Sequence, residues 1–217
     1  LLLTRGYIMY KILNLFLLMS FTSCSTIYYK SWEVLGKEKR DLLESNMGDL
    51  SEDQEDAREE FSSVLEKIQK KYYFDGGKLE DTYDKVSSDY EDLESEVNSV
   101  SDQIEKVEEI AEDLFDEWED EADSFENASY RKRSLASLDK TKKNFKGVLV
   151  SARKSEEKMK RLLKKYRDQV LYIKHNLNAK AIGHLSGKLK NLENEMNALI
   201  LELKSSIEKS KNFTTKA

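Results

Sequence analysis

The clearest feature of the chain is a regular spacing of apolar side chains between Leu79 and Trp118. They recur in alternating steps of four and three residues, which is the spacing of one stripe along a supercoiled α-helix. A β-strand would need a period of two. We therefore expect one long helix from about Lys78 to about Phe125, packed along a coiled-coil seam. The seam positions are Leu79, Tyr83, Val86, Tyr90, Leu93, Val97, Val100, Ile104, Val107, Ala111, Leu114 and Trp118.

Less regular patterns of the same kind lie on both sides of this segment and predict two further long helices. The first would run from about Tyr29 to Tyr73 and be followed by a turn at residues 74–77, whose two glycines can adopt the left-handed conformation that caps a helix. The third would begin near Tyr130, after a turn at residues 127–129 that offers an N-cap. Its apolar stripe changes phase near Gly183. The stripe then continues through Leu185, Leu189, Leu192, Met196, Leu199 and Leu203.

The composition is that of long helices with short connections. None of the 217 residues is Pro and only 8 are Gly, whereas the turns of β and α/β folds draw on both. Hydrophobic residues make up 39% of the chain, which suits a narrow apolar seam better than a thick globular core. The fold class that we expect is all-α: an elongated antiparallel helical coiled-coil bundle with three long helices and a possible fourth formed by fold-back.

Charge is divided unevenly between the predicted helices. Residues 78–126 contain 21 acidic and 3 basic residues, a net charge of −18, whereas residues 130–217 contain 8 acidic and 23 basic residues, a net charge of +15. A basic segment can indicate nucleic-acid binding, but the whole chain carries −6, which opposes contact with phosphate backbones. We therefore expect no nucleic-acid partner. Instead, the acidic helix should pair antiparallel with the basic helix that follows it.

Such a hairpin leaves the end of the chain without a partner helix. If the chain turns near residue 128, the beginning of the second helix meets residues 174–180, and about 30 residues beyond them face nothing. Their leucine stripe would be exposed, which monomeric proteins avoid. It must fold back as a fourth helix, pair with another copy, or dock on a protein partner. The contact would be made by Leu185, Leu189, Leu192, Met196, Leu199 and Leu203.

The first residues predict an export signal. Lys11 and an apolar run from Ile12 to Phe21 are followed by two small residues and Cys24. The run is too short to span a bilayer but fits a signal peptide. A cysteine at this place resembles the bacterial lipobox, in which the thiol is acylated. We therefore expect residues 1–23 to be a signal peptide and residues 24–217 to be a lipid-anchored helical coiled-coil domain, with an uncleaved anchor or plain secretion as alternatives.

The residues around this signal predict where the protein starts and where it resides. The sequence begins with Leu, so we expect Met9 to be the true start and residues 1–8 to lie upstream of it. Ser25, and not Asp, follows the cysteine. By resemblance to enterobacterial sorting rules, this favours a periplasm-facing lipoprotein in the outer membrane of a Gram-negative bacterium. Several acyl chains would hold it there stably.

The sequence contains no motif typical of an enzyme. His175 and His184 are nine residues apart, which is not the spacing of a helical zinc site. The acids of the second helix lack the looped spacing of an EF-hand, so we expect a solvated charged face, with weak divalent-ion binding as the alternative. Neither a GxSxG motif nor a glycine-rich phosphate loop occurs. We expect no enzyme activity, no cofactor and no metal site.

Several polar stretches of the chain are similar to those of a known family. They are SWE at 31–33, GKEKRDLL at 36–43, YFDGG at 73–77, LFDEWE at 114–119, and YRDQVL at 166–171 with KHNLNA at 174–179. Together they resemble the proteobacterial family known as domain of unknown function 2959, over essentially all of the mature chain. The resemblance implies a helical exported lipoprotein with no established activity. No catalytic residues are therefore carried over.

Two of these stretches should meet at the end of the rod that lies away from the membrane. Polar and glycine residues at such a tip are poorly explained by packing, so we expect a partner-binding site there. The alternative is that they only cap the turn. The predicted site consists of Asp75, Gly76, Gly77, His175, Asn176 and Asn178.

These features favour a non-enzymatic envelope scaffold or tether that binds a protein partner. One alternative is a regulatory or adaptor subunit of an envelope enzyme or transport complex. Another is a hydrolase that uses a pair of acids, but such catalysis needs a pocket that sets their pKa values apart, and a slender rod offers none.

Overall fold

The computed structural model describes residues 39–70, 79–175 and 179–214. They form four α-helices: α3 (Lys39–Gln69), α4 (Leu79–Asp123), α5 (Ala128–His175) and α6 (Ala179–Thr214). No strand occurs in these three ranges, so the all-α prediction is confirmed. The chain divides at residue 41, and the unit Leu42–Ala217 holds nearly all of α3 and the whole of the other three described helices.

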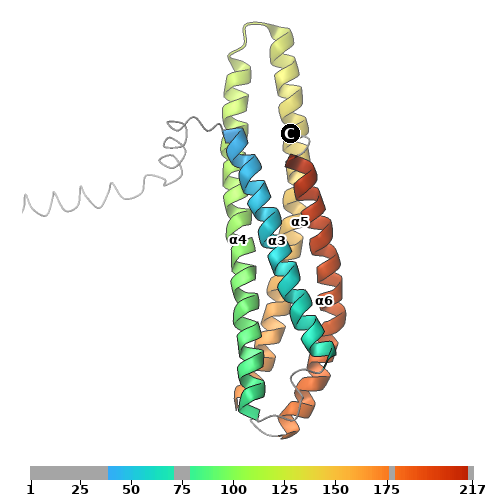
Figure 1. Cartoon of the computed structure of the whole chain (residues 1–217). Helices are drawn as coiled ribbons and strands as arrows, with labels where there is room; N and C mark the ends of the chain where they lie inside the picture. The colour runs from blue at the N-terminus through green and yellow to red at the C-terminus, as the bar shows by residue number, and fades with distance from the viewer. Residues whose placement is uncertain (1–38, 71–78, 176–178, 215–217) are drawn as a thin grey trace, which may run out of the picture. The chain divides into compact units, whose positions relative to one another are not determined.

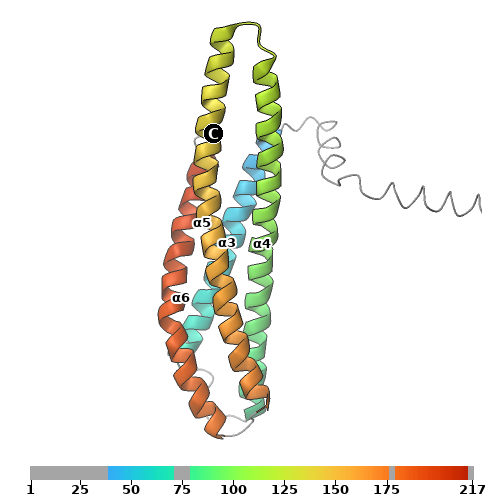
Figure 2. The ribbon, with the colours of Figure 1, turned by 180° about the vertical axis from the view of Figure 1, so that it is seen from behind.

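Within the second unit the helices form an up-down-up-down bundle (Figure 1, and from behind Figure 2). α3 lies between α4 and α6 on one side, and α5 lies between the same two helices on the other. The backbones approach most closely between α4 and α5 and between α5 and α6. α3 is joined to its neighbours through side chains: Gln103 Nε2 donates to the carbonyl oxygen of Asn46 at 2.9 Å, and Gln54 Nε2 donates to Ser206 Oγ at 3.1 Å.

The predicted seam of α4 lies in the centre of the bundle. Tyr83, Tyr90, Leu114 and Trp118 are half-buried, and the side chain of Leu79 lies outside the described residues. Burial of one large apolar side chain stabilises a fold by about 1.5–3 kcal/mol, so this stripe is a main source of the stability of the bundle. The remaining seam positions are all buried: Val86, Leu93, Val97, Val100, Ile104, Val107 and Ala111.

α4 also carries a second stripe, which faces α3. Four of its five positions are polar, so a search for regularly spaced apolar residues passes over it. Gln103 of this stripe bonds to Asn46, and Asp89 accepts a hydrogen bond from Lys67 Nζ at 2.5 Å. The stripe repeats every seven residues and consists of Thr82, Asp89, Glu96, Gln103 and Ile110, all buried except the half-buried Glu96.

The last helix, α6, folds back along α5 and closes the bundle (Figure 2). Fold-back is therefore the alternative that occurs. The chain's own helices cover this stripe, so the exposure that led us to expect a protein partner or a second copy there does not occur, and that contact stays an untested prediction. The side chain of Leu185 lies outside the described residues. The other five, Leu189, Leu192, Met196, Leu199 and Leu203, are each at most 5% exposed.

The third predicted helix is in fact two helices. α5 ends at His175 and α6 begins at Ala179, whereas the phase change of the apolar stripe placed the break near Gly183, which lies inside α6. The physical reason is the length of the partner helix. α5 ends at the level where α4 begins, so a helix continued beyond this point would leave its apolar stripe uncovered (Figure 1).

α4 and α5 extend beyond the end of α6 as a two-helix hairpin (Figure 1). The rings of Phe145 and Phe213 lie 5.8 Å apart where α6 ends. Farther along the hairpin, Trp118 Nε1 donates a hydrogen bond to Ser134 Oγ at 2.9 Å, which joins the two helices. Asn127 Oδ1 accepts a hydrogen bond at 2.9 Å from the backbone N–H two residues later. The N-cap predicted for this turn is thus confirmed.

The structure describes the first predicted helix only from Lys39 onward. The predicted signal peptide at 1–23 and the predicted lipidation site Cys24 lie outside the described residues, so both stay predictions. Among the helices of the described ranges, none has an apolar stretch of the length that would cross a bilayer.

Alanine in place of glycine should stabilise three exposed helix positions. An added Cβ would meet nothing within 4 Å at Gly48, Gly147 or Gly187. Because glycine loses more conformational freedom on folding, Gly147→Ala should raise the free energy of unfolding by about 0.5–1 kcal/mol in urea denaturation. Gly48→Ala and Gly187→Ala should give the same gain. A loss of stability at Gly147 would mean that its side of α5 is covered.

Candidate functional site

The four helices divide the charge of the bundle between two faces. α3 and α4 together contain 30 acidic and 6 basic residues, a net charge of −24. α5 and α6 together contain 8 acidic and 22 basic residues, a net charge of +14. α3 and α4 are neighbours and so are α5 and α6, so the bundle has one acidic and one basic face (Figures 1 and 2).

Ion pairs join the acidic helix α4 to the basic helix α5. In each pair the carboxylate comes from α4 and the cation from α5, so the predicted antiparallel pairing is confirmed. Each partner is about a third exposed or more, and such pairs contribute only about 0–1 kcal/mol each. The pairs are Arg153–Glu108 at 2.6 Å, Lys142–Glu119 at 2.8 Å and Arg131–Asp123 at 2.8 Å.

One glutamate of α5 is buried where α4 and α5 meet. Glu156 is 5% exposed, and its carboxylate accepts hydrogen bonds from Ser101 Oγ at 2.7 Å, Lys160 Nζ at 2.7 Å and Arg153 Nη1 at 3.2 Å. Burial by itself raises the pKa of Glu156, but the three hydrogen bonds and the charge of Lys160 outweigh it, and the pKa is lowered. Glu156 therefore holds α4 and α5 together as an ionised group.

Between α3 and α4, by contrast, acids face acids. Burial raises the pKa values of Asp53, Glu60 and Glu96, and neighbouring carboxylates raise them further. Crowded negative charge therefore destabilises this contact at neutral pH. We call it the acidic interface and define it by Asp53, Asp56, Glu60, Asp89, Asp92 and Glu96.

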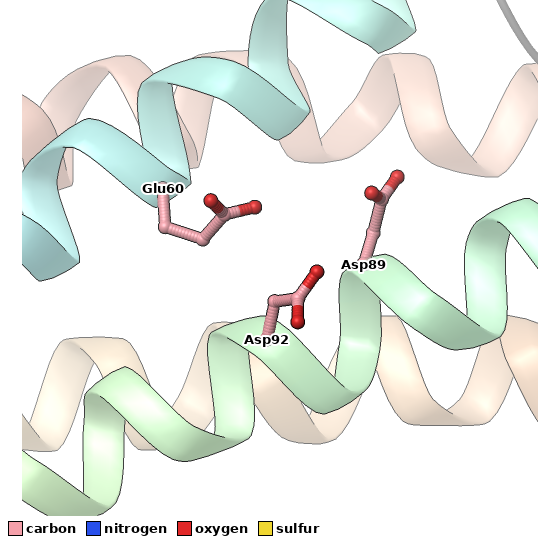
Figure 3. A group of neighbouring side chains, drawn as sticks. All are labelled: Glu60, Asp89 and Asp92. Carbon is pink, nitrogen blue, oxygen red and sulfur yellow. The ribbon is translucent and has the colours of Figure 1, made fainter.

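Three carboxylates of the acidic interface converge (Figure 3). Glu60 extends from α3 toward Asp89 and Asp92 of α4, and one oxygen of each lies within 4.8 Å of the others. Glu60 Oε1 is buried without a hydrogen-bond partner. Carboxylate oxygens suit Ca²⁺ or Mg²⁺, but the Lys67 ammonium already lies 2.5 Å from Asp89 Oδ1. Since Lys67 supplies a cation at the most buried of the three acids, the geometry does not require a metal ion.

Neutralising Glu60 should stabilise the protein. Its pKa is raised, so the folded state binds the proton more tightly than the unfolded state, and its contribution to stability falls as the pH rises from about 4.5 through the raised pKa. At pH 7 the charge is partly buried and repels Asp92 and Asp89, and these effects together outweigh its attraction to Lys67. Glu60→Gln should therefore raise the free energy of unfolding at pH 7 by about 0.5–1 kcal/mol, the size of two relieved like-charge contacts.

The matched control is Glu59→Gln, at the neighbouring position of α3, where the side chain is 69% exposed. It should change stability little. Urea denaturation of both variants at pH 7 and pH 4 checks the prediction, because the gain from Glu60→Gln should shrink at pH 4, where Glu60 is protonated in the native chain. An equal gain at both pH values would contradict the electrostatic cause.

The basic face carries a groove between α5 and the end of α6. Its volume is about 490 Å³. Its lining includes two lysines, two asparagines and the apolar side chains of Val148 and Phe213. No carboxylate and no histidine is among these residues, so the groove lacks an acid–base pair of the kind used in catalysis. The lining residues are Thr141, Lys143, Asn144, Gly147, Val148, Lys209, Asn212 and Phe213.

The predicted partner-binding site at the tip is only partly covered by the structure. Asp75, Gly76, Gly77, Asn176 and Asn178 lie outside the described residues. His175 is the last residue of α5 and is exposed. The site therefore stays a prediction.

Sequence reasoning did not single out the acidic interface. The acids of the second helix were expected to form a solvated face, whereas Asp89 is 4% exposed and Glu96 is half-buried. The available signal was the seven-residue spacing of Thr82, Asp89, Glu96 and Gln103. It was missed because these residues are polar.

Comparisons with known proteins give the family and nothing further. No curated protein and no solved structure matches the chain. The model of a protein family described as "Protein of unknown function (DUF2959)" matches residues 28–217. That range contains all four described helices, the acidic interface and the groove. The chain therefore belongs to the DUF2959 family, as the resemblance of its polar stretches predicted.

Proposed function

We propose that this chain is a non-enzymatic envelope lipoprotein, anchored to the outer membrane through Cys24, which acts as a periplasmic coiled-coil scaffold or tether for a protein partner. The observation that carries the proposal is the use of its polar side chains: Glu108, Glu119 and Glu156 join one helix to the next. The 48 residues of α5 give a rod of about 72 Å at 1.5 Å per residue. Such a rod suits a spacer better than the enclosure of a substrate.

The test uses the full chain in its own bacterium. Wild-type protein should carry acyl groups on Cys24, seen by mass spectrometry, and should be found in the outer-membrane fraction. Cys24→Ala should lose both. A photo-crosslinking residue at His175 should capture one envelope protein, identified by mass spectrometry. The same residue at Leu201, which is 70% exposed on α6, should not capture that protein.

Two results would contradict the proposal. The anchor is wrong if Cys24 carries no acyl group in cells. The scaffold role is wrong if the purified chain catalyses a reaction that disappears when one carboxylate is changed. If the captured protein is an enzyme or transporter whose rate changes when His175 is blocked, the chain is an adaptor or regulatory subunit instead.

A further inference from the structure

The inference concerns the two oppositely charged faces of the bundle, and it depends neither on the lipid anchor nor on a partner at the tip. Only part of the charge on each face is used inside the chain. In the described part of the chain, three acids of α4 pair with α5, Asp89 pairs with Lys67, and three acids of α3 pair with Arg58 or Lys70. These few pairs leave the face made by α3 and α4 strongly acidic, because it carries a net charge of −24.

The surplus acids are directed to the surface along α3 and α4. Asp49, Asp56 and Asp92 are exposed. Burial raises the pKa of Asp53 and the charges of Asp49 and Asp56 raise it further, so the negative charge on this face lowers the stability of the chain itself. Acidic residues that lower the stability of the single chain are explained if a cationic surface covers them.

The opposite face offers such a surface. Lys140, Lys143 and Lys209 are exposed on α5 and α6, and two of them border the groove of about 490 Å³. The two sets of charges lie at different levels of the rod: Lys142, between Lys140 and Lys143, pairs with Glu119 of α4, whereas Asp92 lies beside Glu60. Two copies that are offset along their length bring the two sets together. An anionic membrane or polyanion would also suit the basic face, but it would leave the acidic face uncovered. A second copy of the chain satisfies both.

We propose that copies of this chain associate side by side, offset along the rod, with the acidic face of one bundle (Asp49, Asp56, Asp92) against the basic face of the next (Lys140, Lys143, Lys209). Because the two faces lie on opposite sides of the bundle, the contact is heterologous and each added copy presents a new free face. Exposed ion pairs are worth only about 0–1 kcal/mol each, so association is weak and depends on concentration and salt.

The experiment is sedimentation velocity of the full chain in a non-ionic detergent over a range of protein concentrations. At about 10 mM salt, where charges interact over roughly 30 Å, the mean mass should rise with concentration to at least about twice that of one chain. At about 1 M salt, where the range is roughly 3 Å, it should stay that of one chain.

Charge reversals identify the faces. One variant carries Asp49→Lys, Asp56→Lys and Asp92→Lys, and the other carries Lys140→Glu, Lys143→Glu and Lys209→Glu. All six side chains are exposed, and the only hydrogen bond that any of these six described residues makes to a neighbouring helix is that of Lys209 Nζ to Ser151 Oγ at 3.1 Å. Folding is therefore expected to be preserved, and circular dichroism checks it. Each variant alone should lose association, because the three residues of the proposed contact on one face then carry the same charge as the three on the other face. An equal mixture of the two variants should regain it.

The matched control makes the same change in net charge at the far end of the hairpin, with Asp116→Lys, Asp120→Lys and Glu126→Lys, three exposed residues off the proposed contact. It should associate like the native chain. The proposal is wrong if the native chain stays a monomer at low salt, if the control loses association as fully as the face variants, or if mixing the two variants restores nothing. Sedimentation of a monomeric native chain with anionic vesicles would instead assign the basic face to a membrane surface.

Discussion

Leu199→Ala is expected to lower the free energy of unfolding by about 2–5 kcal/mol, the usual cost of removing a fully buried leucine side chain. Leu199 is 0% exposed in the stripe by which α6 packs into the bundle. The loss combines the transfer of the missing carbon atoms with the cavity that they leave. Urea denaturation followed by circular dichroism measures it, and the midpoint should fall without a change in secondary structure.

Leu201→Ala is the matched control, because Leu201 lies two residues away on the same helix and is 70% exposed. The same chemical change there should alter stability by no more than about 0.5 kcal/mol. The contrast between the two leucines tests the fold-back of α6 directly. A free α6, or one that packs on another molecule through the face of Leu201, would give equal losses or the reverse order.

Glu156→Ala is expected to cost about 2–3 kcal/mol, because it removes a buried carboxylate and leaves the buried Ser101 hydroxyl without its acceptor. We expect a smaller loss of unfolding free energy than for a fully buried ion pair, because Arg153 keeps Glu108 as a partner and Lys160 is about half exposed. The loss concerns the contact between α4 and α5, on which the whole hairpin depends.

The pH dependence of this loss has a definite sign. The pKa of Glu156 is lowered in the folded protein, so the ionised form stabilises the fold fully above the ordinary value of 4.5. That contribution is lost as the pH falls through the lowered folded pKa. The difference between native chain and variant should therefore be constant from about pH 6 upward and shrink in acid.

Glu157→Ala provides the comparison. Glu157 is the next residue, its side chain is 72% exposed, and it pairs only along its own helix with Arg161. It should cost no more than about 0.5 kcal/mol at any pH. Equal losses at the two positions would show that Glu156 is not buried between the helices.

Glu60 and Glu156 show that the same residue type acts in opposite ways in one bundle. Glu156 lies among cations at the junction of α4 and α5, and its charge stabilises the fold. Glu60 lies among carboxylates between α3 and α4, and its charge opposes folding at neutral pH. Glu60 therefore contributes most to stability in acid, whereas Glu156 contributes most at neutral pH. The variants Glu60→Gln and Glu156→Ala measure the two contributions separately.

The hairpin of α4 and α5 could be predicted from the amino-acid pattern without any knowledge of the packing. Its heptad spacing is a local property, so the stripe from Val86 to Ala111 could be assigned to one buried face without knowledge of the rest. Opposite net charge predicted the antiparallel partner, and Asn127 predicted the turn between them. Each of these signals is contained in residues that are close in sequence or belong to one helix.

Which helices lie together on one face of the bundle could not be predicted in this way, because it depends on the packing of all four. α3 is held beside α4 by polar contacts such as the hydrogen bond between Gln103 and Asn46. The local residue pattern of either helix does not predict that the other is its neighbour. The end of α5 at His175 depends on where α4 begins. The burial of Leu199 depends in turn on the fold-back of α6 along α5. The acidic interface exists for the same reason: burial and the approach of like charges are properties of the packed bundle, and a sequence shows only that the acids are there.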